Sequence, residues 1–202
     1  MLRPWLLVVV VALASLASAQ SPPTTPPVPA VPPAPAQPQR DPHAKLMLED
    51  NYDYWSDDGT GGPGLLARVY DDGTVEYGKL RGKEIYTGHV SAGTIAQLGA
   101  ILNSPAVRAL KPSYPALDGW GFTAITYKIR FFSGSVERKV EATNVLPIRK
   151  GHRDEYPTAL LRLVCAVSDI RDAAEPQQFA PKRGDCDEFP QIAKPNLQPG
   201  KP

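Results

Sequence analysis

Residues 123–142 read TAITYKIRFFSGSVERKVEA and form the clearest β-hairpin pattern in the chain. In residues 123–132, every second residue from Ile125 to Phe131 is apolar or aromatic, and the residues between them are polar. Such alternation predicts a strand with one buried and one solvated face. Ser133 and Gly134 then predict a turn into a second strand at residues 135–142.

A second hairpin precedes this segment. Strands are expected at residues 65–70 and 74–77, around the turn Asp71-Asp72-Gly73, because glycine accepts the positive φ that such turns require. Two further strands are expected at residues 45–49 and 84–90.

Two helices complete the predicted domain. Ser91 is a candidate N-cap for a helix with apolar residues at positions 95, 98, 101 and 102, which Pro105 interrupts near its end. Pro157 suits the first turn of a second helix, which Pro176 prevents from continuing. The predicted fold class is therefore α+β over residues 43–173. It has an antiparallel sheet of about five to six strands and two helices on one face, in the order β-β-β-β-α-β-β-α.

The N-terminus has the pattern of a cleaved export signal. Arg3 precedes the apolar run LLVVVVALASL at residues 6–16, and Ala17 and Ala19 stand where a signal peptidase needs small residues. The run is shorter than the about 18 apolar residues that span a bilayer. Residues 1–19 are thus expected to be a signal peptide, with no integral membrane segment after cleavage and a periplasmic or secreted product.

The composition of the rest of the chain indicates a spacer before the domain, a tail after it, and a net charge near zero. Residues 20–42 contain ten prolines and are expected to be an extended spacer, and residues 174–202 a polar, proline-containing tail. Without Arg3 the mature chain carries 21 basic and 21 acidic residues, since the full chain has 22 and 21. A balance near zero argues against nucleic acid as a partner, and a monomer is expected.

The chain contains two cysteines, Cys165 and Cys186. An even pair in an exported protein predicts a disulfide, and here it would tie the tail to the second helix. The alternative is a reactive thiol at Cys186, but Asp185 and Asp187 flank it and negative neighbours disfavour a thiolate.

Two aromatic loops are the candidate contact surfaces. They span residues 51–58 and 114–120, and either could stack on a sugar or contact a protein. The competing interpretation is that Trp55 and Trp120 cap the ends of a small sheet. The candidate partner-contact residues are Tyr52, Tyr54, Trp55, Tyr114 and Trp120.

Patterns that carry catalysis or metal binding are few. His43, His89 and His152 lack metal-ligand spacing, and Asp57-Asp58-Gly59 lacks the downstream carboxylate of a calcium loop. No nucleophile elbow or glycine-rich phosphate loop occurs. No cofactor is expected, and the chain is expected not to be an enzyme.

The run LARVYDDGTVEY at residues 66–77 resembles the opening of a family of small secreted bacterial domains of unknown function. The resemblance covers roughly residues 60–170, including a later Asp-containing loop before a strand and a C-terminal helix that starts at proline. Many members have a Cys-Pro pair before the first hairpin strand, where this chain has Gly61-Gly62-Pro63-Gly64. A thiol role therefore does not carry over.

A second pattern is similar to emfourin-type inhibitors of metalloproteases. It comprises Gly61-Gly62, the segment 98–110, Asp118 and the strand Tyr127-Lys128-Ile129. The N-terminal segment of that family does not match, so no inhibitory residues are carried over. The function expected from the sequence is an exported, non-enzymatic binding or structural module with a protein or cell-wall partner. The alternative is a proteinaceous metalloprotease inhibitor.

Overall fold

The computed structural model describes residues 40–56, 59–79, 83–115, 123–145, 155–177 and 181–197. The expected signal peptide, residues 20–39 of the expected spacer, Trp120 and His152 lie outside these ranges. The last spacer residues, 40–42, are described and contact the domain: the Arg40 guanidinium lies 4.7 Å from the centre of the Tyr70 ring.

The fold is α+β, as expected, with a larger sheet than the sequence predicted. Its main strands are β1 (Leu46–Ser56), β2 (Gly61–Tyr70), β3 (Thr74–Gly78), β4 (Ile85–His89), β6 (Thr123–Ser133) and β7 (Val136–Thr143). The short β5 (Ser113–Tyr114) joins β7 in parallel, so the seven-stranded sheet is mixed, in the order β4-β3-β2-β1-β6-β7-β5. Every other pairing within this sheet is antiparallel.

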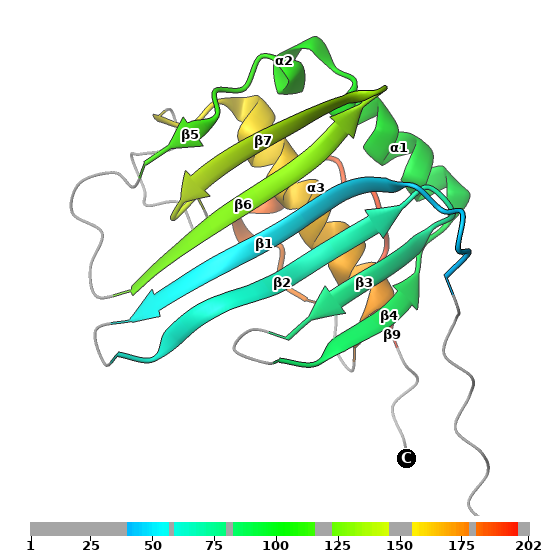
Figure 1. Cartoon of the computed structure of the whole chain (residues 1–202), viewed down its shortest axis with the longest axis horizontal. Helices are drawn as coiled ribbons and strands as arrows, with labels where there is room; N and C mark the ends of the chain where they lie inside the picture. The colour runs from blue at the N-terminus through cyan, green and yellow to red at the C-terminus, as the bar shows by residue number, and fades with distance from the viewer. Residues whose placement is uncertain are drawn as a thin grey trace, which may run out of the picture. The chain divides into compact units, whose positions relative to one another are not determined.

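Helices α1 (Ala92–Leu102) and α3 (Thr158–Ala174) lie against one face of the sheet (Figure 1). We call this the helix face and the opposite side the open face. The Ser91 hydroxyl accepts a hydrogen bond from the Thr94 amide at 3.1 Å, which confirms the predicted N-cap. Pro105 does not interrupt α1. It begins a separate short helix, α2 (Pro105–Arg108), because the Ser104 hydroxyl caps a new first turn.

The core lies between the helices and the sheet. Leu48 of β1, Ile129 and Phe131 of β6, and Leu160, Leu163 and Val167 of α3 are all at most 1% exposed. The alternation predicted for residues 123–132 therefore places its apolar set on the helix face. Pro157 precedes α3 as its cap residue, rather than standing in its first turn.

The C-terminal segment packs against α3, although composition indicated only a polar tail. The predicted disulfide is confirmed: Cys165 of α3 bonds to Cys186, with 5.5 Å between the two Cα atoms. Cys186 lies in a 3-10 turn (Gly184–Cys186), and β8 (Pro176–Gln177) pairs in parallel with β9 (Asn196–Leu197). Ile192 and Ala193 are buried. Part of the expected tail is thus a folded element of the domain.

Candidate functional site

The outer end of the β1–β2 hairpin carries three of the predicted contact residues. Residues 51–56 were expected to form a loop, but they continue β1, which runs to Ser56. Because side chains alternate along a strand, Tyr52 and Tyr54 lie on the helix face and Trp55 on the open face. The three aromatic residues therefore do not form one patch. Tyr52 is 2% exposed and packs inside the domain, whereas Trp55 is 57% exposed.

A glycine-lined pocket of about 510 Å³ lies at this hairpin end. Pro63 and Lys83 contribute to its wall, and the remaining lining residues are Tyr52, Tyr54, Gly59, Thr60, Gly61 and Gly62. The nearby Gly64 gives the Tyr52 ring its room, since a Cβ at Gly64 would lie 2.4 Å from the ring. The Tyr52 hydroxyl donates to the Lys79 carbonyl at 3.4 Å. We call this pocket together with Trp55 the tip site.

The open face next to the tip site is polar. Asp53 pairs with Lys128, and both side chains are about half exposed. Two residues before Asp53 in β1, the Asn51 side-chain amide donates a hydrogen bond to the Glu49 carboxylate at 2.8 Å. A shallow groove of about 450 Å³ continues from here across β6 and β7, lined by Asn51, Lys128, Arg130, Lys139 and Glu141 among others. The surface beside Trp55 therefore offers both hydrogen-bond donors and acceptors.

Glu49 organises the middle of this face. It accepts from Arg68, at 3.3 Å, and from Arg130, and Arg68 also contacts Glu76 at 3.3 Å. Burial alone would raise the pKa of Glu49, but the hydrogen bonds from Asn51 and Arg130, and the charges of Arg130 and Arg68, lower it below its usual value. Glu49 is therefore ionised and holds the two arginines in place.

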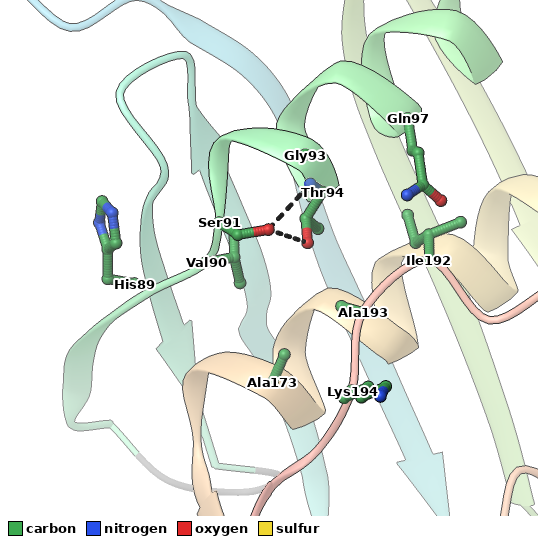
Figure 2. Close-up of a pocket in the computed structure, with 10 residues that line it drawn as sticks. All are labelled: His89, Val90, Ser91, Gly93, Thr94, Gln97, Ala173, Ile192, Ala193 and Lys194. Atoms are coloured by element: carbon green, nitrogen blue, oxygen red, sulfur yellow. Dashed lines mark hydrogen bonds between the residues drawn. The ribbon is translucent and has the colours of Figure 1, made fainter.

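A third pocket, of about 400 Å³, lies where the end of β4 meets the start of α1 and the C-terminal segment (Figure 2). His89, Ser91, Gln97 and Lys194 are its exposed polar members. Figure 2 shows the Ser91 hydroxyl directed at Thr94, so it serves the helix cap. This pocket has no carboxylate among its lining residues.

The most unusual side chain of the domain is Asp50. It is 0% exposed, and neither carboxylate oxygen has a hydrogen-bond partner among the described residues. Ala67 of β2 and Ile129 of β6 stand opposite it. Burial raises the pKa of Asp50 well above its usual value. Burial, together with the charge of Asp50, raises the pKa of Tyr127 to about 12.

The remaining predicted residues are scattered. Tyr114 of β5 is half-buried three strands away from β1, and its hydroxyl accepts from the Lys111 amide at 2.9 Å. His43 and His89 are exposed. Within the described ranges, no group of three or more His, Cys, Asp or Glu side chains is placed to hold a metal ion.

Sequence reasoning missed Asp50 and the pocket glycines. Asp50 is two residues from Leu48 and two from Tyr52, so in a strand all three side chains lie on the same face. This spacing could have indicated a charged residue on the buried face. Gly61-Gly62-Pro63-Gly64 reads as a loop, and only the observed pairing with β1 shows that it continues β2.

Comparison of the chain with protein-family models and with curated proteins finds no match to either. In the part of the chain that the structure describes, no helix has the length and apolar character needed to cross a membrane.

Proposed function

We propose that the protein is an exported, non-enzymatic binding module that holds a glycan of the cell envelope at its tip site. The observation that carries this proposal is Trp55, a large aromatic side chain left 57% exposed at the end of a central strand. The export signal expected at residues 1–19 supports an extracytoplasmic place for it.

The surroundings of Trp55 suit a sugar. An indole face packs against the apolar face of a sugar ring, and exposed Trp is among the residues that most often dominate binding surfaces. Next to Trp55 on the open face, Asp53 offers hydrogen-bond acceptors and Lys128 offers donors for the hydroxyl groups of a sugar. On the other side of the hairpin, the glycine-lined pocket of about 510 Å³ has room for a side branch of the polymer.

The test is co-sedimentation of the full chain with purified, insoluble cell-wall glycan. Trp55→Ala is expected to weaken binding at least about fivefold, since removal of a dominant aromatic contact costs more than about 1 kcal/mol. Val136→Ala is the matched control, because Val136 is also exposed, at 51%, but lies at the opposite end of the β6–β7 hairpin. Its binding should equal that of the wild type.

Two outcomes would contradict the proposal. One is equal binding by Trp55→Ala and Val136→Ala. The other is that the protein inhibits a thermolysin-like protease stoichiometrically, which would favour the inhibitor function.

A further inference from the structure

We propose that Asp50 and the strand irregularity beside it form a pH-sensitive hinge, which loosens the outer half of the β1–β2 hairpin when the Asp50 carboxyl ionises. Its functional consequence, a tip site that binds more weakly as the pH rises, rests on the proposed function above. The hinge itself rests on the fold alone.

The pairing of β1 with β2 breaks register at Asp50. Asp50 pairs with Ala67, but the next residue, Asn51, pairs with Leu65, so Leu66 is an extra residue in β2. A bulge of this kind interrupts the hydrogen-bond ladder and bends the strand. The pairing of β1 with β6 runs through the same point without a shift. The weakest strand pairing is therefore the one between β1 and the outer half of β2, residues 61–65.

The outer half of β2 holds the pocket of the tip site. It contains Gly61, Gly62 and Gly64, which contribute no side-chain packing to the pairing. Gly61 to Pro63 are exposed in the structure. A local opening that begins at the bulge would therefore separate Pro63 and the glycines from Tyr52 and Tyr54.

Among the residues that the structure describes, no cation compensates a negative charge at Asp50. The opposing residues Ala67 of β2 and Ile129 of β6 are apolar. The titratable side chain that responds to its charge is Tyr127 of β6. From α3, Arg171 acts on that tyrosine, but it is paired with Glu175 at 3.1 Å. An ionised Asp50 is therefore stabilised only by water, and an opening of residues 61–65, which begins at the bulge beside Asp50, lets water in while β1 stays paired with β6.

The direction with pH follows from linkage. In the closed hairpin the pKa of Asp50 is raised, whereas in an opened hairpin that exposes it to water it returns to about 3.9. Above that value the open state is ionised and the closed state is not, so each pH unit favours opening by up to about tenfold. The effect levels off once the pH passes the pKa of the closed state.

The experiment is amide hydrogen exchange of the full chain, from about pH 5 to about pH 9, since buried carboxyls can titrate this high. Protection factors of the Gly61, Gly62, Gly64 and Leu65 amides are expected to fall with pH relative to those of β3. Asp50→Asn, which keeps the side-chain shape and cannot ionise, should remove this extra slope. Glu137→Gln, at an exposed position of β7, should keep it.

Equal slopes for residues 61–65 and β3 in the wild type would overturn the hinge, and this comparison needs no variant to fold. An unchanged slope in Asp50→Asn would overturn it as well. Because exchange is measured without a ligand, failure of the hinge and failure of glycan binding are separate results. If both hold, glycan affinity of the wild type should fall with pH, and that of Asp50→Asn should not.

Discussion

Gly73 in the β2–β3 turn has a conformation that only glycine adopts easily. Its φ is 89°, and a Cβ there would lie 2.6 Å from the Val90 carbonyl oxygen and 2.8 Å from the His89 ring. The turn is also tied to the start of α1, because the Val90 amide donates to the Gly73 carbonyl at 2.9 Å. Both the backbone and the space around it therefore require glycine.

Gly73→Ala is expected to lower the free energy of unfolding by about 1–3 kcal/mol, because it combines a strained φ with a steric clash. Gly134 separates these two causes. It also has a positive φ, 62°, but nothing lies within 4 Å of a Cβ built there. Gly134→Ala should therefore cost about 1 kcal/mol. Thermal unfolding of both variants measures the difference, and equal losses would show that the contact with residues 89 and 90 is unimportant.

Gly64 is the second glycine that the structure requires, and it shapes the tip site. In Gly64→Ala the new methyl group would meet the Tyr52 ring at 2.4 Å, so the ring must move away from the Lys79 carbonyl. The glycan affinity of the proposed site should fall with this variant. Gly134→Ala is the control, since nothing lies within 4 Å of a Cβ there and Gly134 lies outside the tip site. Binding unchanged in Gly64→Ala would show that the position of the Tyr52 ring does not matter for glycan binding.

Among the elements, those with strong local signals were predictable from sequence. The Ser91 cap and the apolar positions of α1 fix that helix within its own residues, and the hairpin at residues 123–142 has both alternation and a Ser-Gly turn. The disulfide followed from the expected compartment and an even cysteine count. In each case the deciding interaction is close in sequence or chemically unique.

The elements that sequence did not reveal depend on distant partners. Residues 51–56 look like a loop because Asn51, Asp53 and Ser56 are polar, yet pairing with both β2 and β6 makes them the outer part of a central strand. β5 exists only because it adds in parallel to β7. Trp55 was among the contact residues predicted from sequence, but the opposite orientation of Tyr52 and Tyr54 follows only once the segment is known to be a strand.

At the scale of the whole molecule, a disulfide and a buried carboxylate both hold the C-terminal segment on α3. The disulfide joins Cys165 and Cys186. The carboxylate belongs to Asp169, which is 3% exposed. It accepts hydrogen bonds from the Arg183 guanidinium at 2.9 and 3.1 Å and from the Ile192 amide at 3.1 Å. Arg183 also donates to the Phe189 carbonyl at 3.1 Å. The carboxylate thus organises the segment on both sides of Cys186.

This arrangement predicts that reduction alone will not release the segment. Cleaving a disulfide that closes a loop of 21 residues should lower the free energy of unfolding by about 3 kcal/mol, mainly through the unfolded chain. The native contacts of Asp169 survive that change. Limited proteolysis after Ala174 should therefore stay slow in the reduced wild type and become fast only when Asp169→Asn is combined with reduction.

The reason for the cooperation is that each bond limits how far the segment can move when the other opens. Asp169→Asn removes the charge partner of a nearly buried Arg183, a change that commonly costs about 3–5 kcal/mol, yet the disulfide keeps the segment tethered. Glu175→Gln is the matched control, because the Arg171–Glu175 pair on the same helix is more exposed and such i,i+4 pairs contribute only about 0.3–0.5 kcal/mol. Rapid cleavage in the reduced wild type would show that the disulfide alone retains the segment, and that Asp169 serves only the packing of α3.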